Sequence, residues 1–386
     1  MMKKFVAVLM AMLMVIPAFA MAEGAQVVKI GVFEPASGDS GAGGKQEILG
    51  MQYANTIAPT VEIGGQTYNV ELVYADNGSS ADKAPSAAQQ LVSEGVSVVL
   101  GSYGSGVSIA GSQYFADAGI PAIGVSCTNP QVTSGNTHYF RICFLDPFQG
   151  TVLANYAFKE LGATTAYCLA ELGNDYDVGL AHYFQKAFEA LGGKVISETF
   201  PTGTSDFTSY LNNATGYGAQ VFFAPCSIAY STQIINQAAG LAVNYPLMGG
   251  DTWDSNKVVE SATGTAVKVL VSTFYQEGGD EAFDSGIKAW MNENAEALTN
   301  NGGNDMVAAV TAMGYDAYFT ALEALKLAGS TDGKAVNEAL WNVSYTGVTG
   351  AIAFDTTGDA VRDAAYIKTV NTETGAWDFV AVQGVE

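Results

Sequence analysis

The chain has 386 residues, of which 48% are hydrophobic, and it carries a formal net charge of −22 at pH 7. That length suits two domains, and the hydrophobic fraction is ample for packed cores. The negative charge argues against nucleic acid as a partner, because phosphates would repel such a surface, and against anionic membranes. An acidic surface of this kind mainly keeps a protein soluble.

The N-terminus has the three parts of a secretory signal. Residues 1–4 form a short basic head, residues 5–19 are apolar, and Ala20 and Ala22 occupy the −3 and −1 positions of a cleavage site. The apolar run is shorter than the roughly 20 residues that a membrane-spanning helix needs. We therefore expect residues 1–22 to be a cleaved signal peptide and the mature protein to work in the periplasm.

Cysteine and histidine are scarce. The chain has four cysteines and two histidines, and they form no CxxC motif and no zinc-ligand spacing. We therefore expect no metal site and no cofactor. An exported protein can form a disulfide, and Cys127 and Cys143 are the nearest pair in the sequence. The sequence leaves open whether these two are bridged or are plain buried thiols.

Strand and helix patterns alternate along most of the chain. Strands are predicted at 27–33, 68–74, 96–100 and 120–125, with helices at 46–57, at 79–93 and after Ser105. The pattern restarts with helices at 150–161, 179–191, 207–213 and 231–239, between strands at 165–170, 194–200, 220–224 and 245–248. Such alternation predicts parallel sheets with helices on both faces. The predicted fold class is therefore α/β, with two lobes of similar build.

A long periodic helix at 307–327 and a strand-rich region at 351–382 complete the pattern. Segments near 144–148, 272–275 and 354–358 are candidate crossings between the lobes. The predicted division assigns residues 23–146 and 274–355 to lobe one, and residues 147–273 and 356–386 to lobe two.

Ligands of such sheets bind beyond the carboxyl ends of the strands. Two facing lobes would place these ends on both sides of one cleft. The segments that follow the predicted strands are 102–105 and 126–128 in lobe one, and 171–176, 225–227 and 250–253 in lobe two. We therefore expect the binding pocket to be built from these five segments.

The two sides of this cleft differ in chemistry. At 98–115 (VVLGSYGSGVSIAGSQYF), a strand, a Gly/Ser loop and a helix direct free N–H groups and hydroxyls to one point, which suits a carboxylate or phosphate. Lobe one offers hydroxyl and N–H groups at Ser105, Ser126 and Thr128. Lobe two offers an acid and aromatic rings at Asp251, Trp253 and Tyr176. An anion-binding side opposite an acidic, aromatic side suits a zwitterion, and an α-amino acid is the simplest one.

The chain resembles the branched-chain amino acid (Leu/Ile/Val) binding proteins, which are the periplasmic substrate-binding components of ABC importers. The resemblance covers nearly the whole mature chain and runs in order through KIGVFEPASGDSGAGGKQEILGMQYA, VVLGSYGSGVS, PAIGVSCTNPQVT, YFRICFLDPFQG, NDYDVGL, PLMGGDTWDS and AMGYDAYFTALEAL. It implies the type I periplasmic binding protein fold, in which two Rossmann-like lobes are joined by a three-stranded hinge. It also implies an ABC permease as partner, and we expect a monomer that captures its ligand by hinge closure.

The resemblance also assigns site residues. In that family a Ser after the third strand, a small residue and a Thr after the fourth, and an acid in lobe two hold the ligand's carboxylate and amine. Matched position by position, these are Ser105, Ser126, Thr128 and Asp251. A tyrosine of the family's second lobe falls on Tyr176.

Other positions depart from the family pattern. The family's aromatic residue in the N-terminal loop falls on Gly43, and a second lobe-two tyrosine falls on Cys226. Tyr103 and Trp253 add aromatic bulk elsewhere, so we include Cys226, Tyr103 and Trp253 among the ligand-binding candidates. The ligand therefore stays open among Leu, Ile, Val, other amino acids, amides, urea and aromatic acids.

Enzyme motifs are missing from the sequence. GSYGSG lacks the GK[ST] ending of a phosphate-binding loop, and neither GxSxG nor HExxH occurs. His138 and His182 lie beside no plausible nucleophile in the sequence. We therefore expect no catalytic residue and a binding protein rather than an enzyme. A sensory module of the same fold, which feeds a membrane receptor, is the remaining alternative.

Overall fold

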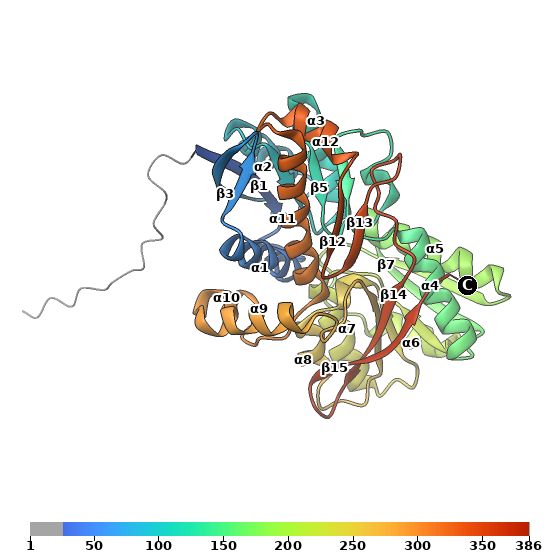
Figure 1. Ribbon diagram of the computed structural model, residues 1–386. Coiled ribbons are helices and arrows are strands. Elements are labelled where there is room, and N and C mark those ends of the chain that lie inside the picture. The colour runs from blue at the N-terminus through green and yellow to red at the C-terminus, as the bar shows by residue number, and fades with distance from the viewer. Residues whose placement is uncertain (1–25, 386) are drawn as a thin grey trace, which may run out of the picture.

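The computed structural model describes residues 26–385, so the predicted signal peptide at 1–22 lies outside the described residues. Figure 1 shows two α/β lobes, each built around its own sheet. Within the described part of the chain, helices are too short or too polar to cross a membrane. The same residues hold no cluster of three metal-ligating side chains.

Lobe one is built on a six-stranded sheet with the order β2-β3-β1-β4-β5-β6. Its strands are β1 (Gln26–Glu34), β2 (Thr60–Ile63), β3 (Gln66–Asp76), β4 (Val98–Leu100), β5 (Ala122–Gly124) and β6 (Tyr139–Arg141). Its helices are α1 (Gly41–Ile57), α2 (Ala84–Ser93), α3 (Ser105–Ala118), α11 (Ala309–Ala328) and α12 (Gly333–Leu340). The strands run parallel except β2, which pairs antiparallel with β3.

Both faces of this sheet are buried, as a parallel sheet covered by helices requires. Successive side chains of β1 point to opposite faces. Val32 lies in the core that α1 and α11 close, whereas Phe33 packs edge to face on Phe115 of α3 with ring centroids 5.3 Å apart. The strand therefore reads as a nearly continuous apolar run.

Lobe two is built on a seven-stranded sheet with the order β15-β14-β11-β10-β9-β7-β8. Its strands are β7 (Thr165–Glu171), β8 (Lys194–Phe200), β9 (Val221–Phe223), β10 (Leu247–Gly249), β11 (Val269–Thr273), β14 (Ala365–Asn371) and β15 (Ala376–Gln383). Its helices are α4 (Asp146–Asn155), which continues into the π-helical turn η2 (Tyr156–Glu160), α5 (Asp175–Ala190), α6 (Thr208–Gly216), α7 (Ile228–Leu241) and α8 (Asn256–Ala262). β14 and β15 join this sheet antiparallel.

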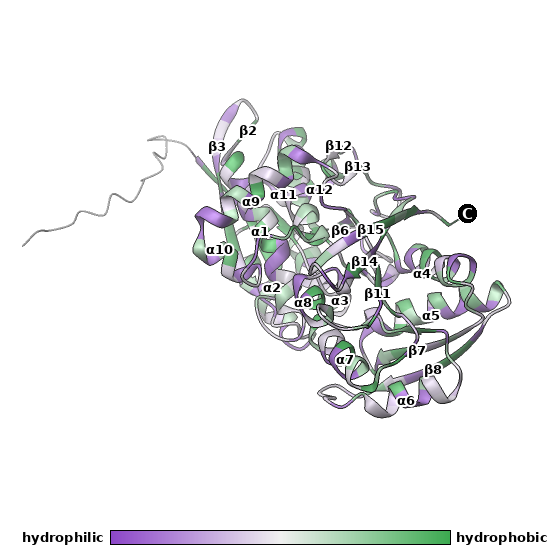
Figure 2. Ribbon diagram, turned by 90° about the horizontal axis from the view of Figure 1, so that it is seen from below, coloured by the Kyte–Doolittle hydropathy of each residue, from purple (hydrophilic) through white to green (hydrophobic). Residues whose placement is uncertain are grey.

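The remaining elements lie near the junction of the lobes or on lobe one. They are α9 (Glu281–Glu293), α10 (Ala295–Asn300), the hairpin of β12 (Ser344–Gly347) and β13 (Gly350–Ala353), and the 3₁₀ turns η1 (Pro130–Val132) and η3 (Asp251–Trp253). In Figure 2, α10 carries both hydrophilic and hydrophobic residues, whereas β7 in the second sheet is largely hydrophobic. The C-terminal end lies against α4, where Asn155 Nδ2 donates to the carbonyl of Val385 over 3.1 Å.

The chain passes between the two sheets three times, in 142–145, 274–280 and 354–364. These segments overlap the candidate crossings predicted from the sequence. The predicted α/β class with two lobes is thereby confirmed.

Several element boundaries differ from the prediction. α1 begins at Gly41 rather than near residue 46, because the glycines of this stretch serve helix packing and not a loop. A Cβ on Gly43 would collide with the ring of Tyr103, and one on Gly44 would collide with Pro35. The glycines therefore permit the start of α1 to lie directly against neighbouring loops.

Candidate functional site

A cleft of about 450 Å³ lies between the carboxyl ends of the two sheets. Loops that follow β1, β3 and β4 form one wall, and loops that follow β7, β8, β9 and β10 form the other. Its lining includes Ser40, Ser79, Tyr103 and Ser105 from lobe one, and Asn174, Tyr176, Ser227 and Thr252 from lobe two. Four of the five predicted segments contribute to this lining, whereas residues 126–128 do not, and the loops after β1, β3 and β8 were not predicted to contribute.

The lobes touch across this cleft. Tyr103 Oη donates to the carbonyl of Thr252 over 3.2 Å, and Asn129 Nδ2 donates to the carbonyl of Asp175 over 2.8 Å. Tyr103, Ser105 and Tyr176 line the open cleft. Three further candidates, Ser126, Thr128 and Asp251, lie deeper and are buried.

The start of α3 supplies the lobe-one end of the site. Gly104 is the N-cap residue, and among the described residues no side chain caps the helix. The first N–H groups of α3 therefore stay available to an anion at the mouth of the cleft. Ser105 is the first helical residue, and its Oγ accepts from the backbone N–H of Asn129 over 3.2 Å. This contact ties the helix start to the loop that carries Thr128.

Thr128 and Asp146 are buried behind the lining of the cleft. The backbone N–H of Asp146 donates to the carbonyl of Thr128 over 3.0 Å. Thr128 Oγ1 and both carboxylate oxygens of Asp146 are buried and make no hydrogen bond within residues 26–385. Burial raises the pKa of Asp146 to about 8. Burial thus favours the protonated form of Asp146 at neutral pH, and a cationic group beside it would favour the ionised form.

Sequence reasoning missed Asp146. It lies at the start of α4, directly before Pro147, where an acid reads as an ordinary residue of a first helical turn. Its place in the FLDPFQG segment, at a predicted crossing between lobes, was the available signal.

Glu34 and Glu47 form a buried acidic pair behind the lobe-one wall. Glu34 Oε2 accepts from the backbone N–H of Tyr103 over 2.7 Å, and Glu47 Oε1 accepts from Ser126 Oγ. Burial and the nearby Glu47 carboxyl raise the pKa of Glu34 well above its usual range, and burial raises the pKa of Glu47 to about 7. Because Ser126 gives its hydroxyl proton to Glu47, its oxygen keeps only lone pairs for any further partner.

Tyr176 and Asp251 supply the lobe-two side. Tyr176 lies in the first turn of α5, where Asn174 Oδ1 accepts from its backbone N–H over 3.1 Å and fixes the helix start. Tyr176 Oη donates to Asp251 Oδ1 over 2.9 Å. Burial raises the pKa of Asp251 to about 6, so this carboxyl is mostly ionised at neutral pH. A Cβ on Gly250 would collide with Tyr176 Oη.

Cys226 and Trp253 lie in the hydrophobic core of lobe two, and neither side chain lines the cleft. The indole Nε1 of Trp253 donates to the carbonyl of Cys226 over 3.1 Å, and Thr252 Oγ1 donates to the same carbonyl over 3.0 Å. These bonds join the loops after β9 and β10 and so hold Asp251 in place. All four cysteines are buried free thiols in this part of the chain, Cys127 and Cys143 included.

Tyr103 takes the place of an aromatic residue that the N-terminal loop lacks. Its ring packs over Gly43, the position at which the sequence resemblance expected that aromatic. Burial raises the pKa of Tyr103 well above its usual range, which keeps the hydroxyl protonated as a donor to Thr252. The cleft therefore has an aromatic wall that comes from the loop after β4.

Comparison with known proteins agrees with this geometry. The family model described as periplasmic binding protein matches residues 27–376, so the chain belongs to the periplasmic binding protein family. The Leu/Ile/Val-binding protein homolog 1 of Brucella abortus is 28% identical over 337 residues, which cover 86% of this chain and 87% of that protein. The predicted resemblance to branched-chain amino acid binding proteins is thereby confirmed.

Solved structures share the fold. The leucine binding protein LivK of Thermotoga maritima is 30% identical, with a TM-score of 0.83 over 93% of this chain and 99% of that one. LivJ of Streptococcus pneumoniae, solved in complex with isoleucine, is 27% identical, with a TM-score of 0.79 over 92% of this chain and 99% of that one. A solute binding protein of Rhodopseudomonas palustris, solved with benzoate, is 20% identical, with a TM-score of 0.78 over 92% of this chain and 96% of that one.

Proposed function

We propose that this periplasmic binding protein captures an α-amino acid between its lobes and delivers it to the permease of an ABC importer. The observation that carries the proposal is the pairing of chemistries across the cleft. The uncapped start of α3 and the unpartnered Thr128 hydroxyl supply donors on one side. Asp251 on the other side and Asp146 behind the cleft lining supply buried carboxyl groups. A zwitterion satisfies both sets at once.

In the proposed pose, the ligand's carboxylate lies against the first N–H groups of α3, the Ser105 hydroxyl and Thr128. The ammonium group lies between Asp146 and Asp251, with the ring of Tyr176 beside it. Ser126 contributes lone pairs rather than a donor, since its proton goes to Glu47. The ammonium thus gains charge-assisted hydrogen bonds, which contribute about 1.5–3 kcal/mol each.

The side chain of the ligand would lie toward Tyr103 and the outer cleft. The names of the relatives favour a branched aliphatic side chain. An amide, urea or an aromatic acid lacks the ammonium group and would leave Asp146 and Asp251 uncompensated. We therefore rank an α-amino acid first and keep these other ligands as outcomes of the test.

We further propose that the lobes comprise residues 23–146 with 274–355 and residues 147–273 with 356–386. They would hinge about the three crossings. Contacts from both lobes form only in the closed state, so the ligand favours closure by its differential affinity. A shift from mostly open to mostly closed needs roughly 5 kcal/mol, which a few charge-assisted bonds can supply.

The proposed setting is the periplasm, reached through the signal at residues 1–22, with the closed monomer docking on a membrane permease. A sensory role for the same fold would use the same ligand chemistry but a different membrane partner. Reconstituted import distinguishes the two roles, because a sensory module would not stimulate ATP-dependent uptake.

A thermal-shift screen tests the proposal. The mature protein is unfolded and refolded to remove bound ligand and then tested with aliphatic, aromatic and polar amino acids, amides, urea and benzoates. A ligand at about 100 times its Kd stabilises the folded state by about 2.7 kcal/mol, which raises the melting temperature clearly. Shifts confined to one group of α-amino acids support the proposal. Shifts only with amides, urea or benzoates would refute the role given to Asp251.

A further inference from the structure

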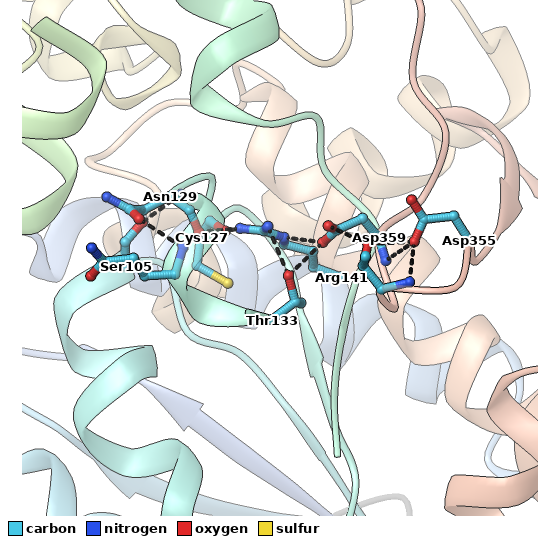
Figure 3. A network of polar contacts seen from close by, with 9 residues as sticks. Ser105, Cys127, Asn129, Thr133, Arg141, Asp355 and Asp359 are labelled. Carbon is cyan, nitrogen blue, oxygen red and sulfur yellow. Dashed lines mark hydrogen bonds and ion pairs between the residues drawn. The ribbon is translucent and has the colours of Figure 1, made fainter. Parts of the chain in front are cut away.

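Arg141 lies behind the ligand site, at the end of β6, and its side chain is fully buried. Figure 3 shows the polar network around its guanidinium group. Nε donates to Asp359 Oδ1 over 2.6 Å, and Nη2 donates to Thr133 Oγ1 over 3.0 Å. Nη1 donates to the carbonyls of Cys127 and Asn129, over 2.8 and 2.5 Å. The planar guanidinium thus holds several partners in one fixed geometry.

Two of these partners belong to the ligand loop. The carbonyls of Cys127 and Asn129 flank Thr128, so the guanidinium fixes the peptide units on both sides of that residue. Asn129 continues the connection, because its N–H donates to Ser105 Oγ and its amide group reaches Asp175 of lobe two. Arg141 therefore sets where Thr128 stands without facing the cleft itself.

The other main partner belongs to the third crossing between the lobes. Asp359 lies in the segment 354–364 and also accepts hydrogen bonds from Thr133 and Thr357. The backbones of the two crossings are joined as well, since the Arg141 N–H donates to the Gly358 carbonyl over 2.9 Å. Arg141 is the last residue of β6, directly before the first crossing, and Asp359 lies in the third crossing. The ion pair therefore joins the two crossings.

We propose that Arg141 and Asp359 are positioning residues that link the ligand loop to the hinge. Through their ion pair, the position of Thr128 depends on the position of the third crossing. Ligand affinity and lobe closure then both depend on a buried pair that never touches the ligand. The part of this inference that concerns affinity rests on the proposed amino acid function.

The competing explanation is that the pair only stabilises lobe one. Any buried ion pair destabilises a fold when one partner is removed. A purely structural pair would lower the melting temperature but leave the affinity of the folded protein and its lobe separation unchanged. The discriminating measurements are therefore ligand affinity well below the melting temperature and the radius of gyration without ligand.

The test uses Arg141→Lys and Asp359→Asn, with Thr133→Val as the matched control. Lysine keeps the positive charge, but its single ammonium group cannot replace the planar guanidinium, which binds Asp359 and the carbonyls of Cys127 and Asn129 at once. Asparagine keeps the shape of the side chain and an acceptor for Arg141 Nε. Asp359→Asn alone therefore tests the proposal if Arg141→Lys does not fold. Thr133→Val removes two hydrogen bonds of the same network and leaves both loop anchors and the ion pair in place.

Titration calorimetry with the amino acid found in the screen should give a Kd at least about tenfold higher for both variants and within about threefold for the control. X-ray scattering should give a different ligand-free radius of gyration for Asp359→Asn than for the wild type. A Kd within about twofold of wild type together with an unchanged radius of gyration would overturn the inference. If the wild type binds no amino acid, the proposed function fails, and an unchanged radius of gyration alone then overturns the inference about the hinge.

Discussion

The hydroxyl of Tyr176 donates a 2.9 Å hydrogen bond to Oδ1 of Asp251. This bond joins the first turn of α5 to the turn η3 that follows β10, and both side chains are buried. It fixes the orientation of the carboxylate and stabilises its charged form. The lobe-two end of the site is therefore organised before a ligand arrives.

Asp251→Asn should weaken the binding of an α-amino acid at least about tenfold, which corresponds to about 1.4 kcal/mol. The amide keeps the shape of the side chain but removes the charge that an ammonium group needs. Calorimetric titration of both proteins measures the difference. Asp175→Asn is the matched control. It removes the same charge from the cleft, but from an exposed side chain. Equal affinity of Asp251→Asn and wild type would refute the proposed ammonium site.

Replacing Ser105 and Thr128 together by alanine should weaken carboxylate recognition. The double variant should therefore lose more affinity for an amino acid than for the corresponding amino acid amide, by about fivefold or more. The reason is that a charged acceptor makes stronger hydrogen bonds than a neutral one. Competition binding with the acid and its amide gives the ratio directly. Equal losses for the two ligands would contradict the assignment of lobe one to the carboxylate.

Stability of the ligand-free protein should fall as pH rises from about 4 to about 8, because burial raises the pKa of Asp146 from 3.8 to about 8. When folding raises the pKa of an acid, the folded state binds a proton more tightly than the unfolded state does. The resulting contribution to the free energy of unfolding is lost as pH rises through the pKa of the folded state. An ammonium ligand supplies the missing counter-charge, so its stabilising effect should grow over the same range.

Melting curves of wild type and Asp146→Asn with and without ligand, over this pH range, test the expectation. The asparagine variant cannot titrate at this position, so the fall with pH should be shallower. Parallel pH profiles for the two ligand-free proteins would show that Asp146 is already compensated by some other group.

Gly250→Ala should abolish or strongly weaken ligand binding, because the new Cβ would collide with Tyr176 Oη. Moving that hydroxyl breaks its bond to Asp251 and changes the lobe-two wall. Gly240→Ala in α7 is the control, since a Cβ there meets open space. This second change should stabilise the fold by roughly 0.5–1 kcal/mol without affecting affinity. Chemical unfolding and ligand titration of both variants separate the two effects, and normal binding by Gly250→Ala would contradict the arrangement.

The fold could be predicted because strand patterns alternate with segments of helical periodicity along the chain. Residues 194–200 were predicted as a strand and form β8 with these bounds, and α11 was predicted within two residues at its start. The strand β2 was missed because its four residues are too few for a local pattern to show. Local patterns therefore predicted the layers better than the short elements between them.

The site could be predicted only in part. Topology fixes which loops face the cleft, so Tyr103, Ser105 and Tyr176 could be predicted from the sequence as lining residues. The direction of a side chain within a loop depends on the turn. Trp253 turns into the core of lobe two because its indole bonds to the carbonyl of Cys226. Asp146 and Glu47 approach the site through contacts between distant segments, which spacing along the chain does not encode.

The most direct measurement compares one α-amino acid with the same molecule without its amino group, for example leucine with 4-methylpentanoate, by titration into refolded protein. Both ligands offer the carboxylate and the same apolar side chain, and only leucine offers an ammonium group to Asp146 and Asp251. We predict that the amino acid found in the screen binds at least about 100-fold more tightly than its counterpart without the amino group. Equal or tighter binding of the counterpart would contradict the account and would favour a carboxylic acid as the ligand.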